Sequence, residues 1–230
     1  EDGAFPTVKS PNPENAEALQ MGIDQAEASQ ADIVIGTDPD SDRMGVVVRN
    51  GAGEMTLLTG NQIGSLMAFY RLKAFTDQGI INEGNRDHAT LVKTFVTTEL
   101  QQAIADSFDV GVVNTLTGFK YIGGKLRKYE NQIPSNLRAD YRKLSDKETR
   151  ALRLKHSKFF VFGGEESYGY LGADFLRDKD GNGAVVMFAE VAAYAKSLGI
   201  TSVELLDQLY AQHGVYLEGQ HAETLSGADG

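Results

Sequence analysis

Three aspartates alternate along the segment DPDSDR, and an arginine follows the last of them. They are Asp38, Asp40 and Asp42, and the arginine is Arg43. In an extended loop alternate side chains point the same way, and three carboxylates on one side repel one another unless a cation lies between them. Mg²⁺ prefers a few carboxylates, waters and a phosphate oxygen as ligands. The spacing therefore predicts a magnesium site that serves a phosphorylated substrate, with Arg43 placed to hold a phosphate.

Three other interpretations of this segment are a solvated acidic turn, an EF-hand and the loop of an aspartyl-nucleophile phosphatase. Asp, Pro and Ser are common in turns, but three acids directly after the apolar run 32–36 make a plain turn less favoured. An EF-hand requires glycine at its sixth position and glutamate at its twelfth, where this chain has Arg43 and Arg49. Aspartyl phosphatases usually carry threonine where this chain has Asp42, so that interpretation stays open as a minor alternative.

Two further polar segments come directly after predicted strands. Lys120 lies in the segment TGFK after the apolar run 110–113, and Glu165 and Ser167 lie in GGEES after the run 158–162. Ligands of open α/β sheets bind at the carboxyl ends of the strands. These two loops and the aspartate segment are therefore expected to converge on one site.

The same residue types also have ordinary structural uses. Judged by type alone, Glu165 and its neighbour Glu166 are as easily explained by helix capping or solvent exposure, and a lysine near a helix start, such as Lys120, is usually solvated. The run 178–181, Asp-Lys-Asp-Gly, could be a second metal loop. A turn into the next helix is the preferred interpretation, because Asp and Gly are typical of such turns.

Short apolar runs alternate with helical periodicity, which predicts an α/β architecture. Strands are expected over residues 32–36, 44–49, 55–58, 91–96, 110–113 and 158–162. Helices are expected from Asn12 as cap with Pro13 in the first position, from Gly60, from a capping box of Thr98 and Gln101, after Lys120, over 183–197 and over 202–213. The charged stretch 131–157 is expected to be a surface excursion, helical in pieces.

The composition of the chain excludes some classes of binding partner and some kinds of functional site. The chain has 230 residues, of which 41% are hydrophobic and 23% charged, which is enough to bury a core. Its net charge of -10 makes nucleic acid an unexpected partner. No apolar run reaches the ~18 residues that span a membrane, so no membrane partner is expected. Because cysteine is absent, disulfides, thiolate zinc sites and cysteine nucleophiles are excluded, and a reducing, cytoplasmic location is expected.

The motifs DPDSDR, TGFKYIG and GEESYGY, in this order, resemble those of the α-D-phosphohexomutase family, the phosphoglucomutases and phosphomannomutases. The opening FPTVKSPNPENAEAL is similar to that family's second domain. Each motif alone is moderately specific, whereas the set is highly specific and covers nearly the whole chain. The surface excursion 131–157 and the sequence GEES resemble the corresponding segments of bacterial phosphoglucomutases more than those of phosphomannomutases.

The resemblance implies a fold and a domain organisation. It implies two consecutive α/β/α domains with mixed sheets, the first of them incomplete. Residues 1–57 would be the latter part of the family's domain 2, residues 58–213 its domain 3, and residues 214–230 a linker toward a missing domain 4. The first domain and its Ser-His-Asn-Pro loop would be missing as well, since no Ser-His dipeptide occurs in the chain.

The resemblance also implies roles for individual residues. The three aspartates would hold Mg²⁺ against a phosphoserine that the missing first domain supplies, and Arg43 would lie beside the transferring phosphate. Glu165 and Ser167 would hydrogen-bond sugar hydroxyls, and Lys120 would approach the substrate as a compact cation.

For the full-length parent, the resemblance implies phosphate transfer between the 1 and 6 positions of a hexose, as in the interconversion of glucose 1-phosphate and glucose 6-phosphate. Two alternatives stay open. The parent could act on mannose or pentose phosphates. The 230-residue chain could also be a module that binds Mg²⁺ or sugar phosphate and catalyses nothing by itself.

Overall fold

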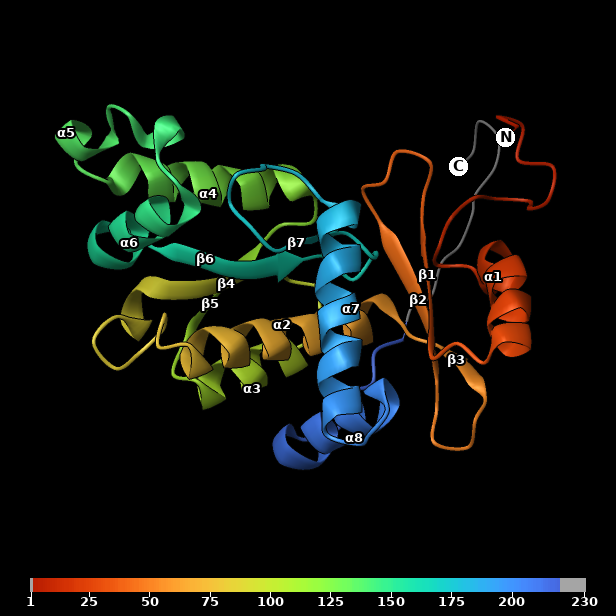
Figure 1. Cartoon of the computed structure of the whole chain (residues 1–230). Helices are drawn as coiled ribbons and strands as arrows, with labels where there is room; N and C mark the ends of the chain where they lie inside the picture. Colours follow the sequence, from red (N-terminus) through yellow and green to blue (C-terminus); the bar gives the residue numbers. More distant parts are fainter. Residues whose placement is uncertain (1, 220–230) are drawn as a thin grey trace, which may run out of the picture.

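Two β-sheets form the framework of the molecule (Figure 1), which is a computed structural model that describes residues 2–219. The first sheet has three antiparallel strands in the order β1-β2-β3, with the bounds Ile33–Thr37, Met44–Arg49 and Met55–Leu57. The second has four strands in the order β5-β4-β6-β7. Their bounds are Gly111–Thr115 for β5, Ala89–Thr94 for β4, Phe159–Gly164 for β6 and Tyr170–Leu171 for β7. Strands β5, β4 and β6 are parallel and β7 is antiparallel, so the second sheet is mixed.

Helices cover both faces of the second sheet, which confirms the expected α/β class (Figure 1). On one face lie α2 (Gly60–Asp77) and α3 (Leu100–Ser107), and on the other α4 (Phe119–Gln132) and α6 (Asp146–His156). Helix α1 (Ala16–Ser29) packs on the first sheet, and α7 (Gly181–Ser197) and α8 (Ser202–His213) lie between the two sheets. The short helical turns are η1 (Arg86–His88), α5 (Ser135–Arg138) and η2 (Tyr141–Lys143).

The larger of two hydrophobic core clusters among the described residues joins the two sheets, and the smaller lies between the second sheet and α4. The larger cluster includes Met44 and Val46 of β2, Leu66 of α2, Phe162 of β6 and Phe188 of α7, none of which has measurable exposure. Because burial of apolar side chains is the main favourable contribution to folding, this shared core holds the first sheet in a defined position against the second. The loops that follow β1 and β6 are thereby held next to each other. The domain boundary expected between residues 57 and 58 stays a prediction.

Local capping explains where the best-predicted helices begin. The Thr59 side chain accepts from the backbone N–H of Gln62 while the Gln62 side chain accepts from that of Thr59, which starts α2 where the sequence predicts it. Thr201 and Glu204 make the same reciprocal pair at the start of α8. Helix α8 has the bounds expected from the sequence.

Two predicted helix starts are wrong. Helix α1 begins at Ala16 with Asn15 as cap, because Asn12 instead closes a local turn by accepting from the Glu14 backbone N–H. The expected capping box before α3 does not form either. Glu99 is the cap residue, and Thr98 uses its hydroxyl to accept from the N–H of Leu100 two residues later.

The stretch 131–157 is more than the expected surface excursion. It carries α5, η2 and α6, and its Arg153 is the largest fully buried side chain among the described residues. Arg153 Nε donates to the Tyr141 hydroxyl at 2.7 Å, and its Nη1 donates to the carbonyl of Leu126 at 3.3 Å. The charged residues of this stretch are therefore not all solvated, because the buried Arg153 links α6 to η2 and α4.

The linker expected over residues 214–230 lies outside the described residues from residue 220 onward. Residues 214–219 form no helix or strand. Within the described part of the chain, no single helix is long and apolar enough to cross a membrane. Helices α7 and α8 meet the length and composition criteria only as a pair bent by 83°, and the structure packs α7 against both sheets.

Candidate functional site

The loop between β1 and β2, residues 38–43, is called the aspartate loop below, and it is folded around Asp38. One carboxylate oxygen of Asp38 accepts from the backbone N–H groups of Asp42 at 3.1 Å and Arg43 at 3.0 Å. The Asp38 carbonyl accepts from the N–H of Ser41, which adopts a left-handed conformation with φ 58°. These bonds curl the loop so that its three carboxylates face one another.

The three aspartates form a cluster that suits a hard divalent cation. Asp38, Asp40 and Asp42 each offer a carboxylate oxygen, and these oxygens lie within 4.8 Å of one another. Oxygen donors at this spacing, with the outer side exposed at Asp40, fit the few carboxylates that Mg²⁺ uses alongside water. The spacing prediction for the three side chains therefore agrees with their geometry, while the identity of the ion stays a prediction.

Arg43 leans back over the carboxylates of its own loop. Its guanidinium lies 3.9 Å from Asp38 and 3.8 Å from Asp42, and it reaches Glu14 at 3.5 Å. Burial raises the pKa of Asp38, the hydrogen bond from the Arg43 backbone lowers it, and the neighbouring Asp42 and Asp40 carboxylates raise it, so that the net shift is upward. Arg43 offsets the negative charge of the three carboxylates only in part, and a bound cation would offset more of it.

A lysine that the sequence analysis did not single out completes this loop. Lys179 Nζ lies 2.8 Å from Asp42 and 3.1 Å from Asp178, and its side chain is 16% exposed. Burial lowers the pKa of Lys179, but its hydrogen bonds to Asp42 and Asp178 together raise it. The preferred interpretation of 178–181 as a turn is confirmed, because Asp180 accepts from the Gly183 N–H at 2.9 Å and caps α7. The one sequence feature that could have predicted the contact with Asp42 is the position of Lys179 between Asp178 and Asp180.

The loop after β6, residues 165–169, is called the glutamate loop, and its first residue is held by the turn that precedes α4. Glu165 is 7% exposed, and its Oε1 accepts from the backbone N–H of Gly118 at 2.7 Å. Among the described residues its Oε2 has no hydrogen-bond partner and stays available to a ligand. Since the Gly118 turn follows β5, the carboxyl ends of β5 and β6 meet here as the sequence predicts.

The aspartate and glutamate loops are in direct contact. Arg43 and Gly169 form an antiparallel bridge, and the N–H of Met44 donates to the carbonyl of Tyr168 at 3.1 Å. The start of α7 closes the arrangement, since the Gly181 N–H donates to the carbonyl of Ser41 at 3.0 Å. A Cβ at position 181 would lie 2.5 Å from that same oxygen, so this contact requires glycine.

The remaining predicted residues are placed less tightly. Glu166 is half-buried, and its carboxylate accepts from the Thr94 hydroxyl at 3.2 Å, which gives it a structural role at the end of β4. Ser167 is half-buried beside it. Lys120 is exposed at the second position of α4, with Nζ 5.1 Å from the ring centre of Tyr121. Within the described part of the chain Lys120 makes no ion pair, so its expected approach to the substrate stays a prediction.

Metal binding to this loop is expected to weaken as the pH falls. The pKa of Asp38 lies above its ordinary value of 3.8. The metal-free folded state therefore binds the proton of the Asp38 carboxyl more tightly than the unfolded chain does. The stability of the metal-free fold falls as the pH rises from the pKa of the unfolded chain to that of the folded state. A bound Mg²⁺ would displace this proton. The rise in melting temperature on adding Mg²⁺ should therefore be larger at neutral pH than below about pH 5. An equal rise at both pH values would contradict the assignment of Asp38 as a ligand.

Two domain models of one protein family match this chain. Residues 1–51 match the phosphoglucomutase/phosphomannomutase alpha/beta/alpha domain II, and residues 59–138 and 146–213 match domain III of the same family. The chain belongs to the phosphoglucomutase/phosphomannomutase family. A phosphoglucomutase of Staphylococcus aureus (strain MSSA476) is 31% identical over 229 residues, which cover 100% of this chain and 36% of the relative. The same values hold for the phosphoglucomutase of strain N315.

Solved structures of this family share the fold. A phosphoglucomutase/phosphomannomutase family protein from Burkholderia thailandensis superposes with a TM-score of 0.58 at 19% identity, over 90% of this chain and 35% of that one. The Paramecium phosphoprotein parafusin, a phosphoglucomutase, gives a TM-score of 0.53 at 17% identity, over 88% of this chain and 30% of that one. The chain therefore spans about a third of the length of the family members it matches, as with the 36% of the curated relative.

Proposed function

We propose that this chain is the metal-binding and sugar-binding part of a phosphohexomutase that interconverts glucose 1-phosphate and glucose 6-phosphate with Mg²⁺ in the cytoplasm. The observation that supports this most is the direct contact between the aspartate loop and the glutamate loop, through Arg43 with Gly169 and Met44 with Tyr168. A cation site for phosphate and a buried carboxylate with a free oxygen thereby lie side by side.

The residues on each side of this contact have distinct tasks in the proposal. The three aspartates hold Mg²⁺, which supplies positive charge to stabilise the transferring phosphoryl group. Arg43 and Lys179 line the same loop with further positive charge. Glu165 is fixed through Oε1 by the Gly118 N–H, which leaves Oε2 to accept from a sugar hydroxyl. Ser167 and Lys120 join the sugar and phosphate contacts.

The phosphate donor is proposed to lie outside these 230 residues. The chain has no Ser-His dipeptide, and it covers 36% of a related phosphoglucomutase. The 230-residue chain alone is therefore expected to show no turnover in a coupled assay that oxidises glucose 6-phosphate, whereas the full-length protein should be active with Mg²⁺ and lose activity with EDTA. Absence of mutase activity in the full-length protein would overturn the proposed function. Turnover by the chain alone would overturn only the external donor.

Glucose phosphates are proposed over mannose and pentose phosphates because the 31% identical relatives are phosphoglucomutases. The test compares kcat/KM of the full-length protein for glucose 1-phosphate, mannose 1-phosphate and ribose 1-phosphate. A higher value for either alternative would reassign the substrate without affecting the metal site.

A further inference from the structure

A second depression in the molecule, remote from the aspartate loop, is lined by basic side chains. It has a volume of about 530 Å³, and its titratable lining side chains other than Tyr129 are three lysines and two histidines: His88, Lys125, Lys128, His156 and Lys158. None of the Asp and Glu residues between positions 2 and 219 lines it. This depression is called the lysine pocket below. In a chain with 32 acidic and 22 basic residues, a pocket without any carboxylate is the opposite of what average composition predicts.

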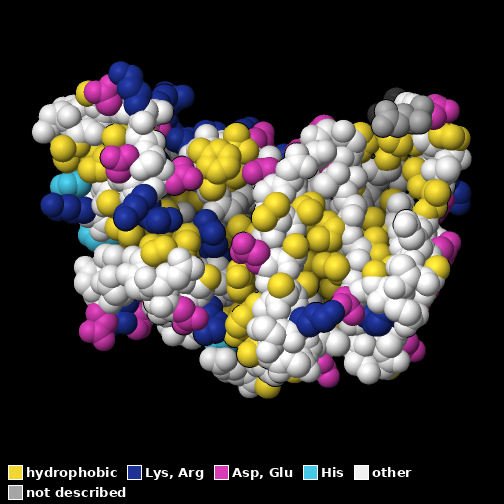
Figure 2. All heavy atoms as spheres, in the orientation of Figure 1, with side chains coloured by type: hydrophobic (Ala, Val, Ile, Leu, Met, Phe, Trp, Pro, Cys, Tyr) yellow, Lys and Arg dark blue, Asp and Glu magenta, His cyan; other side chains and the backbone are white. Residues whose placement is uncertain are grey.

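The lysine pocket lies at the other end of the second sheet from the candidate site. His88 and Lys158 directly precede β4 and β6, whose first residues Ala89 and Phe159 are paired. The aspartate and glutamate loops meet at the carboxyl end of β6, about 20 Å away along a six-residue strand. In the orientation of Figure 2, histidine and lysine or arginine side chains gather at the left edge, where Figure 1 has the end of α6. A ligand in this pocket would not touch the proposed mutase site.

The basic side chains of the pocket are not neutralised from within the described part of the chain. Neither Lys125 nor Lys128 forms an ion pair with a described carboxylate, and Lys158 donates only to the backbone carbonyl of Asp87. His88 Nδ1 lies 2.6 Å from the carbonyl of Ser157, which can only accept, so Nδ1 carries the proton. Its Nε2 has no hydrogen-bond partner among residues 2–219. Lys125 and Lys158 are half-buried, so the charge of their ammonium groups is less screened than on an open surface.

A structural explanation competes with ligand binding here. Helices α4 and α6 end at Gln132 and His156, next to the pocket, and cations near helix C-termini are favourable by themselves. That explanation accounts for His156 and Lys128, which lie in or near the last turns. It does not account for Lys158, which precedes a strand, or for Lys125 in the middle of α4. The two explanations differ in one measurable respect, because helix-end compensation needs no anion in solution.

We propose that the lysine pocket binds a small molecule carrying phosphate groups, at a site separate from the mutase centre. Ammonium groups are donors that match phosphate oxygens, and the two histidine rings line the pocket beside the three lysines. A pocket of about 530 Å³ has room for more than one phosphate group. The acidic surface of the rest of the chain disfavours a long polyanion such as nucleic acid. The inference does not depend on the proposed mutase function.

The test uses the 230-residue chain, with inorganic phosphate and inorganic triphosphate as probes and EDTA present to exclude metal. Histidine ring signals are followed by NMR, since the chain has four histidines and two of them line the pocket. Triphosphate is expected to shift the signals of His88 and His156, assigned with His88→Asn and His156→Gln, and to leave the other two unchanged. Absence of a shift at both pocket histidines would overturn the proposal without any lysine variant having to fold.

Calorimetry on lysine variants provides the second arm. Lys125→Ala/Lys158→Ala should bind triphosphate about tenfold more weakly or worse. The matched control, Lys9→Ala/Lys147→Ala, removes the same charge from exposed positions outside the pocket and should bind as wild type. Equal weakening in both pairs would indicate a general charge effect. Binding lost in Arg43→Ala but kept in Lys125→Ala/Lys158→Ala would assign the anion to the aspartate loop. Either result overturns the lysine pocket as a site.

Discussion

Asp40→Asn is expected to lower the mutase turnover proposed for the full-length protein about a thousandfold, corresponding to about 4 kcal/mol of transition-state stabilisation. Asp40 offers a carboxylate oxygen within 4.8 Å of those of Asp38 and Asp42, and it is the exposed member of the three. An amide in its place keeps the shape of the side chain but removes one negative charge and makes a weaker ligand. The coupled assay measures turnover, and calorimetry on the 230-residue chain should show Mg²⁺ binding weakened about tenfold or more.

The matched control for Asp40→Asn is Asp32→Asn. Asp32 immediately precedes β1, is exposed and pairs with Lys196 at 2.6 Å, so this variant removes the same charge from the same sheet outside the aspartate loop. Its turnover and Mg²⁺ affinity should match those of wild type. Unimpaired turnover in Asp40→Asn would remove the aspartate loop from the mechanism, and an equal loss in both variants would point to a nonspecific charge effect.

Arg153→Ala is expected to destabilise the chain by about 3–5 kcal/mol, the usual cost of breaking a buried ion pair from one side. The Arg153 side chain has no exposed area, and its Nη2 lies 2.9 Å from Asp174, close enough for an ion pair although not aligned as a hydrogen bond. Its Nε and Nη1 bond Tyr141 and the carbonyl of Leu126. Truncation leaves the Asp174 carboxylate, which is only 20% exposed, without its partner. Urea unfolding followed by circular dichroism measures the change.

Arg150→Ala on the same helix is the control for this stability measurement. Arg150 is half-buried, and its guanidinium lies 5.6 Å from the ring centre of Phe75. Loss of such a contact costs about 1 kcal/mol or less. Similar destabilisation by both variants would show that α6 tolerates no arginine loss, and that Arg153 has no special role in the interior.

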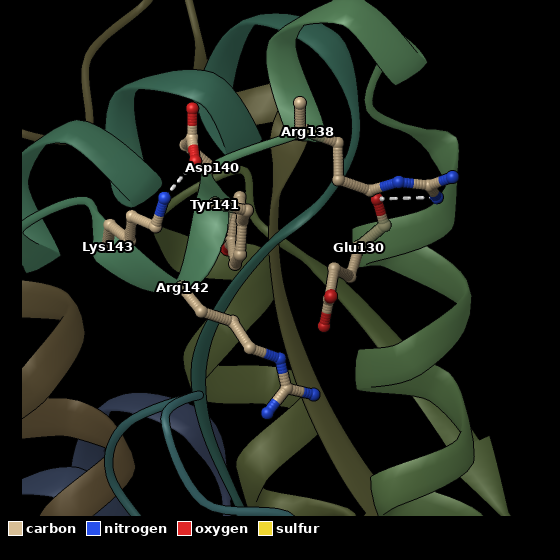
Figure 3. Close-up of a pocket in the computed structure, with 7 residues that line it drawn as sticks. Glu130, Arg138, Asp140, Tyr141, Arg142 and Lys143 are labelled. Atoms are coloured by element: carbon tan, nitrogen blue, oxygen red, sulfur yellow. Dashed lines mark hydrogen bonds and ion pairs between the residues drawn. The ribbon is translucent and has the colours of Figure 1, made fainter.

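Other basic side chains lie near η2, but their ion pairs differ from the buried pair of Arg153 with Asp174. Figure 3 shows Arg142 beside Tyr141 and Glu130 in a smaller pocket of about 250 Å³, where Lys143 pairs with Asp140 and Arg138 donates to the Glu130 carbonyl. Asp140, Arg142 and Lys143 are exposed, and Arg138 is half-buried. Ion pairs at such positions contribute about 0–1 kcal/mol, so the effect expected for Arg153 comes from its burial and not from its charge alone.

Strand ends show where prediction from local pattern fails. The apolar residues Phe95 and Val96 were expected to complete a strand, but β4 ends at Thr94 and they are 64% and 56% exposed. The fully buried Lys93 explains the early end, because its Nζ bonds the Thr97 carbonyl and the Glu99 carboxylate, both at 2.9 Å. These partners pull the chain into a turn. An apolar run alone carries no information about such a buried cation.

The sequence by itself determined the features that depend on near neighbours. The start of α8 follows from the reciprocal bonds of Thr201 and Glu204. The three aspartates cluster because the backbone N–H groups of Ser41, Asp42 and Arg43 all bond Asp38, a few positions away, and curl the loop. The α/β class follows in the same way from the alternation of apolar runs. These properties involve residues a few positions apart, where spacing almost fixes geometry.

Only the tertiary structure decided which distant residues meet. Lys179 reaches Asp42, Glu165 accepts from Gly118 and Arg153 is enclosed, each across many residues of sequence. Such contacts depend on how the two sheets and their helices pack together in the interior, a sum of many weak interactions that no local pattern contains. The aspartate loop was therefore recognisable from the sequence, whereas its neighbours in the folded protein were not all recognisable.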